Sequence, residues 1–288
     1  MWNCKLCLGL GSGFDIPISE QIKLLKQTGF DGFFTEFSSR EAVSENRQLA
    51  DEYGLIYQSL HAPFGKMKTM WEAGKGDAAV AELIDCLETC AENRIPIMVA
   101  HTFIGFEDHT PNEIGLENFG KVVLAAERLG VKIAFENTEG EEYLEAVMKR
   151  FNDSPAVGFC LDTGHEMCYN HSKDLTLTHG DKLIATHIND NLGIKSFDGK
   201  ITFLDDLHLL PFDGIRDWQE TVGRLARCGV RDLLTFELNI HSKPGRHDND
   251  IYEQMPLERY FALAFARACR VARLLQSVIS SNETRSNI

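Results

Sequence analysis

The pattern that most constrains the fold is a strict alternation of short apolar runs with longer amphipathic segments along the whole chain. The apolar runs have strand length and lie at 5–10, 32–37, 56–61, 97–101, 132–137, 157–162, 184–189 and 234–239. The segments with helical spacing lie at 19–28, 40–53, 77–93, 111–129, 140–151, 166–171, 215–228 and 257–280. Several of these helices are expected to end at a glycine, the usual left-handed residue at a helix C-terminus.

Eight strand–helix pairs predict a parallel sheet, and eight is the number that closes a (β/α)8 barrel of roughly 250 residues. The alternative is an open doubly wound sheet, which usually carries a Gly-rich ligand loop, but residues 9–13 lack the dinucleotide-binding spacing. We therefore predict an α/β fold with a single TIM barrel domain over residues 1–280 and a polar tail over 281–288. A longer insert is expected between the seventh strand and Ile215.

Charge and hydropathy limit the partners. The 288 residues include 29 Lys and Arg against 43 Asp and Glu, a formal net charge of −14. Binding through nucleic-acid phosphates needs clustered basic residues, and the densest basic stretch, 259–273, has the spacing of a solvated helix face. We expect no nucleic-acid partner. No apolar run reaches the roughly 18 to 20 residues of a membrane span, and the first residues lack signal-peptide features, so neither a membrane partner nor secretion is expected.

The chain contains eight cysteines. In a chain of this length without a signal peptide, we expect them to be reduced and mostly structural, which favours a cytoplasmic location.

Polar residues recur at one place in each strand–helix unit, the end of the strand. They are His61, His101, Glu136, Asp162, His187 and Glu237, with His165 just beyond the sixth strand. In a barrel these ends converge on the face where active sites lie.

Side-chain alternation indicates which way these residues point. Two positions before Glu136, Asp162, His187 and Glu237 stand the small residues Ala134, Cys160, Ala185 and Thr235. The opposite parity carries Phe135, Leu161 and Phe236, which are bulky enough to pack beneath helices. The acids and the histidine are therefore predicted to face the narrow barrel interior.

Three carboxylates and an imidazole at one mouth would repel one another without a countercharge, and a divalent cation supplies it. An oxygen-rich set with one histidine suits Mn, Mg or Co, whereas several histidines favour Zn.

The sequence resembles the xylose isomerase-like sugar phosphate isomerase/epimerase superfamily over essentially its whole length. The motifs are HAPF at 61–64, FENT at 135–138, CLDTGH at 160–165, THINDN at 186–191, DLHLLPFDGIRDW at 206–218 and FEL at 236–238. They are specific for the superfamily and poorly specific for the reaction.

Similarity to the ketose 3-epimerase branch implies one Mn, Mg or Co ion held by Glu136, Asp162, His187 and Glu237, and Zn is the further candidate that the several histidines favour. The same resemblance makes Glu136 and Glu237 the acid/base pair that moves a proton beside a sugar carbonyl, through an enediolate. It implies substrate contacts for His165 and Glu142. One departure is Gly193, where that branch carries an arginine, so the substrate clamp differs.

Further substrate contacts are expected around this centre. The resemblance to sugar-converting members of the superfamily implies that His61, His101, Asp206 and His208 hydrogen-bond substrate oxygens. Trp71, Phe64 and Phe103 are expected to stack on a sugar from mouth loops. Lys195, Lys200 and Arg216 lie in a region that could hold a phosphate or carboxylate.

Other functions stay open. The chain also matches all nine ligands of the trinuclear-zinc apurinic endonucleases: His61, His101, Glu136, Asp162, His165, His187, Asp206, His208 and Glu237. Loss of a β-hydroxyl from the same enediolate would make the enzyme a dehydratase or lyase of a keto-polyol. A non-catalytic sugar-binding barrel or subunit is a further alternative. The expected partner is a small carbohydrate, with a homodimer possible by resemblance.

Overall fold

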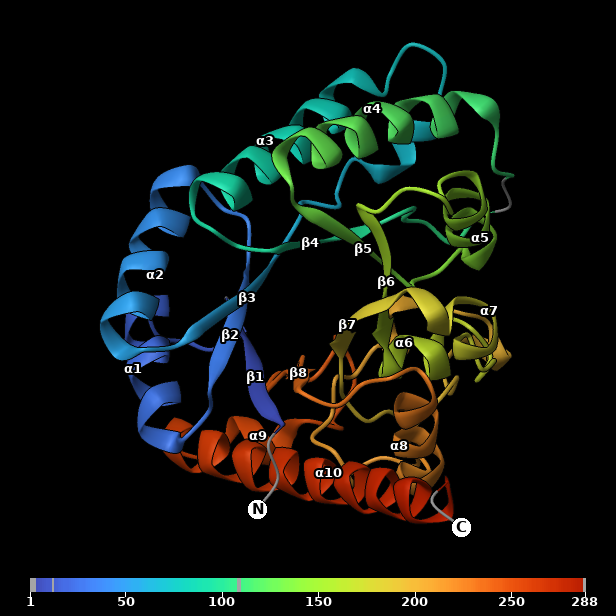
Figure 1. Cartoon of the computed structure of the whole chain (residues 1–288). Coiled ribbons are helices and arrows are strands. Elements are labelled where there is room, and N and C mark those ends of the chain that lie inside the picture. Colours follow the sequence, from blue (N-terminus) through green and yellow to red (C-terminus); the bar gives the residue numbers. More distant parts are fainter. Residues whose placement is uncertain (1–3, 12, 108–109, 287–288) are drawn as a thin grey trace.

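Eight parallel strands form the inner wall of the structure, a computed structural model that describes residues 4–11, 13–107 and 110–286 (Figure 1). The strands are β1 Lys5–Leu10, β2 Gly32–Glu36, β3 Ile56–His61, β4 Ile97–His101, β5 Lys132–Glu136, β6 Val157–Asp162, β7 Leu183–His187 and β8 Leu233–Phe236. Their order in the sheet is β7-β6-β5-β4-β3-β2-β1-β8, so each strand pairs with its neighbours in sequence and β8 returns to β1. The predicted (β/α)8 barrel is confirmed.

The barrel closes between β7 and β8 through a few hydrogen bonds just beyond the regular ladder. Ile188 N donates to Thr235 O at 2.8 Å, and Glu237 N donates to Ile188 O at 3.2 Å. The Thr186 hydroxyl accepts a further hydrogen bond from Thr235 N at 3.1 Å. This junction brings the strand ends that carry His187 and Glu237 side by side.

Helices surround the strands (Figure 1). The α-helices are α1 Ile18–Thr28, α2 Arg40–Tyr53, α3 Asp77–Glu92, α4 Glu113–Leu129, α5 Glu141–Arg150, α6 Thr163–Cys168, α7 Thr176–His179, α8 Trp218–Arg227, α9 Asp250–Glu253 and α10 Leu257–Ser286. Short 3₁₀ turns are η1 Met67–Trp71, η2 Gly180–Lys182, η3 Phe197–Gly199 and η4 Phe203–Asp205. The helix α10 packs against α1 and α8 along the side of the barrel.

Several helices differ from the sequence-based boundaries, and two of these differences lie at α6 and α10. The helix α6 begins at Thr163 rather than at 166, because the Asp162 carboxylate accepts a hydrogen bond from His165 N and caps the helix. The helix α10 continues to Ser286, so residues 281–286 extend the last helix. Residues 287–288 of the predicted tail lie outside the described residues.

The predicted side-chain parity is confirmed by the packing. Ala134, Cys160 and Ala185 are buried with Val99 in a small cluster inside the barrel. Phe135, Leu161 and Phe236 belong to the larger core between strands and helices. Small interior residues leave room above them for the polar side chains at the strand ends.

All eight cysteines are free. No helix within the described residues has the length and apolar character needed to cross a membrane.

Candidate metal and substrate site

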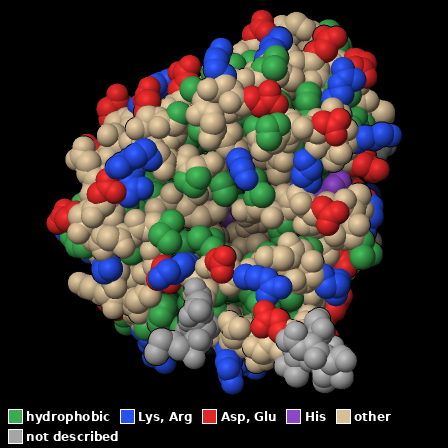
Figure 2. All heavy atoms as spheres, viewed as in Figure 1, with side chains coloured by type: hydrophobic (Ala, Val, Ile, Leu, Met, Phe, Trp, Pro, Cys, Tyr) green, Lys and Arg blue, Asp and Glu red, His purple; other side chains and the backbone are tan. Residues whose placement is uncertain are grey.

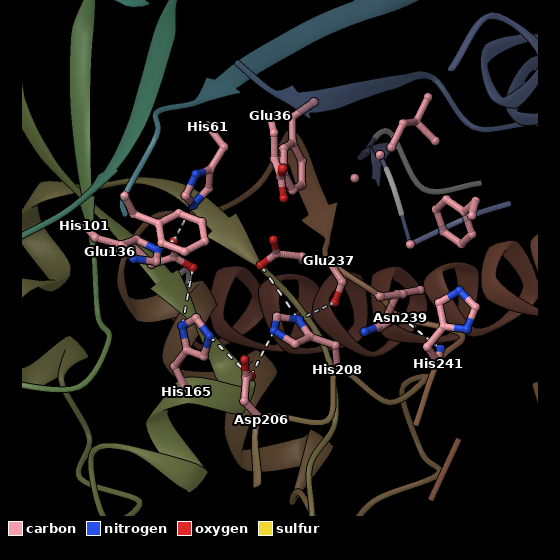
Figure 3. Close-up of a pocket in the computed structure, with 18 of the residues that line it drawn as sticks. Glu36, His61, His101, Glu136, His165, Asp206, His208, Glu237, Asn239 and His241 are labelled. Atoms are coloured by element: carbon pink, nitrogen blue, oxygen red, sulfur yellow. Dashed lines mark hydrogen bonds and ion pairs between the residues drawn. The ribbon is translucent and has the colours of Figure 1, made fainter. Parts of the chain in front are cut away.

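A cavity of about 410 Å³ opens at the carboxyl ends of the strands (Figure 3). Its polar wall consists of Glu36, His61, His101, Glu136, His165, Asp206, His208, Glu237, Asn239, His241 and Lys243. Strand ends and the loops that follow them supply these residues, as the sequence predicted for a barrel.

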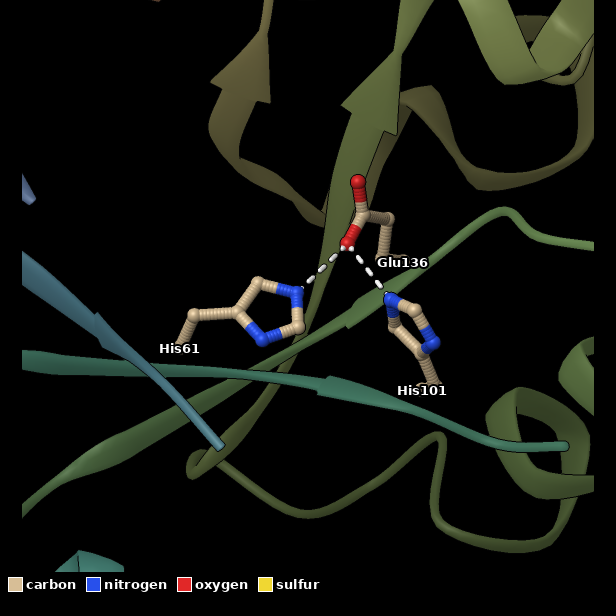
Figure 4. Close-up of side chains that lie close together, drawn as sticks. All are labelled: His61, His101 and Glu136. Atoms are coloured by element: carbon tan, nitrogen blue, oxygen red, sulfur yellow. Dashed lines mark hydrogen bonds and ion pairs between the residues drawn. The ribbon is translucent and has the colours of Figure 1, made fainter. Parts of the chain in front are cut away.

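Glu136 lies at the centre of the group and is completely buried. Its Oε2 lies 3.2 Å from His61 Nε2 and 3.2 Å from His101 Nε2 (Figure 4). Its Oε1 lies 2.8 Å from His187 Nδ1. A single carboxylate therefore faces three imidazole nitrogens at 2.8 to 3.2 Å.

Glu237, the residue directly after β8, approaches the same imidazole. Its Oε2 lies 3.1 Å from His187 Nδ1, and its side chain keeps 27% of its exposure. The His187 ring stacks on Phe34 at 4.5 Å between ring centres. The imidazole is thus fixed by packing with its Nδ1 directed between two carboxylates.

Asp162 completes the inner set and is completely buried. Its Oδ1 accepts a hydrogen bond from His165 N at 2.7 Å, and its Oδ2 accepts one from Asn189 Nδ2 at 2.9 Å. Asn137 holds the adjacent backbone, because its Oδ1 accepts from Asp162 N at 2.8 Å. These two amides orient the carboxylate. Both lie within the motifs FENT and THINDN, but the sequence pattern alone indicated no role for them.

A second polar group lies beside the first, around Asp206. Its Oδ1 lies 3.3 Å from His165 Nε2 and 2.9 Å from His208 Nε2 (Figure 3). Its Oδ2 accepts a hydrogen bond from Lys243 Nζ at 3.3 Å. His208 has a φ of 49°, in the left-handed region that a non-glycine residue rarely adopts. A hydrogen-bond contact of 3.1 Å between His208 Nδ1 and Glu237 O holds it there.

The carboxylates and imidazoles shift one another's protonation. Burial alone would raise the pKa of Glu237, but His187 and His208 beside it lower that pKa to about 2. Burial likewise opposes ionisation of Glu136, yet His187, His101 and His61 hold its pKa well below the usual range. For Asp162 burial prevails and raises the pKa to about 6. Burial would lower the pKa of His208, but Asp206 and Glu237 raise it to about 9.

The donor set fits a divalent cation. One ligand atom from each of Glu136, Asp162, His187 and Glu237 lies within 4.8 Å of the others, and His61, His101 and Glu136 form a second group by the same criterion. Without a metal ion, protonated imidazoles supply the positive charge that stabilises these carboxylates. A bound divalent cation can supply this charge instead, once the imidazole that coordinates it has lost its proton. These four residues are the ones predicted as ligands from the strand ends, and the structure brings them together.

Several residues predicted near a substrate lie elsewhere. Trp71 does not line this cavity: it is buried, its Nε1 donates to Thr102 O at 2.9 Å, and its ring packs against Phe119 and Tyr143. This placement corrects the expectation that Trp71 stacks on a sugar. Phe103 is also buried, whereas Phe64 lines the cavity and stacks on His101 at 4.7 Å.

Glu142 is exposed and lines a separate cavity together with Lys200. It is therefore outside the group around Glu136, contrary to the contact that the resemblance implied. Arg216 is no surface anion site, because its side chain is buried and pairs with Glu166 at 3.2 Å. The cation that lines the cavity is Lys243, in a loop after β8 that carries no motif and that sequence reasoning missed.

Known proteins are similar to this chain in sequence. The uncharacterized protein y4fM of Sinorhizobium fredii is 26% identical, over 95% of this chain and 93% of its own length. A probable endonuclease 4 of Nitrosopumilus maritimus is 25% identical, over 65% of this chain and 70% of its own length.

Solved structures show the same fold at low sequence identity. A D-psicose 3-epimerase superposes with a TM-score of 0.71 at 16% identity, covering 94% of this chain and 99% of that protein. The IOLI protein, solved with a bound zinc atom, gives 0.70 at 19% identity, covering 93% and 98%. A fusion of a xylose isomerase-like TIM barrel with 4-hydroxyphenylpyruvate dioxygenase gives 0.73 at 15% identity; 98% of this chain aligns, but it spans only 45% of that protein.

The family profile described as xylose isomerase-like TIM barrel matches residues 22–256. This match covers most of the chain, including every strand from β2 to β8 and the residues around Glu136. The chain belongs to the xylose isomerase-like TIM barrel family.

Proposed function

We propose that this protein is a divalent-metal-dependent isomerase or epimerase of a sugar or sugar phosphate. One observation carries the proposal. Glu136 on β5 and Glu237 after β8 both reach His187 Nδ1, at 2.8 and 3.1 Å, and both line the same cavity. Two carboxylates thus face one small enclosed volume from different strands, which is what proton removal and return on a bound sugar requires.

Glu136, Asp162, His187 and Glu237 would hold the ion, and zinc bound to the IOLI protein supports a metal in this fold. When bound, a divalent cation stabilises negative charge that develops on substrate oxygens. The carboxylates of Asp162 and Glu136 are oriented before any ligand arrives, by Asn189 in one case and by three histidines in the other.

The two glutamates differ in access to the cavity. Glu237 is partly exposed, and His187 and His208 lower its pKa to about 2, so its carboxylate is ionised at neutral pH. Glu136 is ionised and buried, at the floor of the cavity. Both glutamates are ionised in the protein alone, so epimerisation requires one of them to take up a proton when substrate binds; it gives this proton to one face of the carbon while the other glutamate, as the carboxylate, removes the proton from the opposite face. In an isomerisation, the glutamate that takes the proton returns the same proton to the neighbouring carbon. His165 and His208 donate hydrogen bonds to substrate oxygens.

Solvent exchange tests this proposal across many candidate sugars at once. Metal-free protein is reloaded with Mn, Co, Mg or Zn and incubated in D2O with a panel of ketoses, inososes and their phosphates. Proton NMR then reports deuterium entering the carbon beside the carbonyl. We expect exchange with at least one panel member, and loss of that exchange by about 10²- to 10⁴-fold in Glu237→Gln.

The exposed Glu45→Gln on α2 is the matched control and should exchange like the unmodified protein. A folded, metal-loaded protein that exchanges no panel member would refute the proposal. Elimination of water in place of isomerisation would show in the same spectra as a new dehydrated product, and would reassign the enzyme as a lyase.

An apurinic endonuclease is the second candidate, favoured by the 25% identity to the probable endonuclease 4 and by the clustering of the nine matching residues. Two observations disfavour it. The net charge is −14, and on the face shown in Figure 2 Lys and Arg side chains are interspersed with Asp and Glu. Incision of an oligonucleotide with one abasic site, in the presence of zinc, tests this candidate directly.

A further inference from the structure

Two consecutive aspartates, Asp205 and Asp206, meet two cations from one loop after β8. Lys243 Nζ donates to Asp206 Oδ2 at 3.3 Å, and Arg246 donates to Asp205 Oδ1 at 2.6 Å. Asp205 is completely buried, and the side chains of Asp206 and Lys243 keep 14% and 20% of their exposure. The two cations lie three residues apart in their loop, and the two aspartates that they contact are adjacent in sequence.

The loop that carries Lys243 is tied to the segment that carries Asp206. Asn249 is completely buried, and its Nδ2 donates to Leu207 O at 3.1 Å and to Asn239 O at 2.8 Å. Asn239 N donates to His208 O at 3.0 Å, and Arg246 N closes a turn onto Lys243 O at 2.8 Å. These hydrogen bonds hold the loop after β8 against the segment that contains Asp206, and so hold the Lys243 ammonium group beside the Asp206 carboxylate.

This ammonium group changes what the group around Asp206 can bind. The carboxylate already faces His165 and His208 through Oδ1 and Lys243 through Oδ2. Among the described residues, Asp206 belongs to no group of side chains whose ligand atoms lie close enough together to hold one ion. His165 and His208 belong to such a group only together with Asp162. A divalent cation between these two histidines and Asp206 would lie next to a permanent positive charge, and like charges at such distance repel strongly.

We propose that Lys243 takes the place of a third cation in this site. The chain then binds no ion at His165, Asp206 and His208, so its ions, at most two, lie at donor groups that include Glu136. Those three residues and Lys243 instead form a hydrogen-bonding wall for a substrate's oxygen atoms. The substrate class in this inference rests on the proposed function, but the number of metal ions does not.

Metal stoichiometry tests the proposal. Protein is stripped with a chelator, reloaded with zinc, desalted and analysed by inductively coupled plasma mass spectrometry. We expect no more than two ions per chain in the unmodified protein and in Lys243→Arg, which keeps the charge. Lys243→Met removes the charge with little change in volume and should bind one ion more. Lys149→Met, an exposed lysine on α5, is the matched control and should leave the count unchanged.

A second variant keeps the test decisive if Lys243→Met does not fold. His208→Ala removes a donor from the group around Asp206 and should leave the zinc count of the protein as it was. Three ions in the unmodified protein, a loss of one ion in His208→Ala, or no gain in a folded Lys243→Met would each overturn the proposal.

The outcome is separable from the proposed function. Sugar exchange together with three bound zinc ions would refute the role of Lys243 and keep the isomerase or epimerase. A count of two or fewer without any exchange would keep the role of Lys243 and refute the function.

Discussion

Asn189 Nδ2 donates a hydrogen bond to Asp162 Oδ2 at 2.9 Å, and the Asn189 amide in turn lies directly against the backbone at Gly164. A Cβ at position 164 would stand 1.9 Å from Asn189 Oδ1. The glycine in the CLDTGH motif thus allows the amide to approach and orient a predicted metal ligand. Groups that orient metal ligands are worth about 10- to 100-fold in metal affinity.

Gly164→Ala should therefore weaken metal binding by about 10- to 100-fold while the barrel stays folded. Calorimetric titration with Mn or Zn measures the effect. Gly223→Ala on α8 is the control, because the added Cβ meets no atom within 4 Å outside the neighbouring residues and backbone of its own helix. Equal affinities of the two variants would contradict the role assigned to Asn189.

Metal ions should stabilise the fold through Glu136. A ligand at a hundred times its dissociation constant adds about 2.7 kcal/mol to the free energy of unfolding. We expect EDTA to lower the Tm of metal-loaded protein and Mn or Zn to restore it, as followed by circular dichroism. Glu136→Gln should abolish this metal-dependent rise, whereas Glu45→Gln should keep it; a rise that persists in Glu136→Gln would place the ion elsewhere.

The helix α6 is held by a buried ion pair behind the site. Glu166 receives two hydrogen bonds from Arg224, at 2.6 and 2.7 Å, and one from Arg216 at 3.2 Å. Glu166→Gln leaves two buried guanidinium groups without this counterion and should cost about 3 to 5 kcal/mol, measured by urea unfolding.

Glu220→Gln is a matched control for this prediction. Glu220 reaches the same Arg224, but at 4.0 Å and with 63% of its side chain exposed. An exposed pair contributes about 0 to 1 kcal/mol. Similar losses in both variants would show that burial does not determine the strength of this ion pair.

Most thiols should be unreactive in the folded protein. Six of the eight cysteines are buried, and Cys228 and Cys269 are half-buried. Burial raises the pKa of Cys4 to about 12, and also raises those of Cys228 and Cys269. A raised pKa lowers the reactive thiolate fraction at pH 8. Ellman's reagent should therefore modify at most two thiols rapidly in native protein and all eight after unfolding; rapid reaction of more than two would contradict the packing.

The sequence by itself determined the barrel and its inner donor set. Strand side chains alternate with a period of two, so the small residues Ala134, Cys160 and Ala185 revealed which parity faces the interior. Glu136, Asp162 and His187 have the same parity as these small residues, so their side chains face the barrel interior at the carboxyl ends of the strands, whatever the conformation of the loops. The motifs that contain these three residues carried the family resemblance, and the resemblance assigned them the role of metal ligands.

Only the tertiary structure decided what surrounds these residues. Trp71 follows no periodic pattern that would reveal its direction, and packing against Phe119 and Tyr143 turned it away from the cavity. Lys243 lies 37 residues from Asp206 in sequence, and two loops bring them together. The direction of a strand side chain can be predicted from sequence, because the strand backbone makes successive side chains point to opposite faces. A loop has no such repeat, so the direction of its side chains depends on contacts between segments that are distant in sequence.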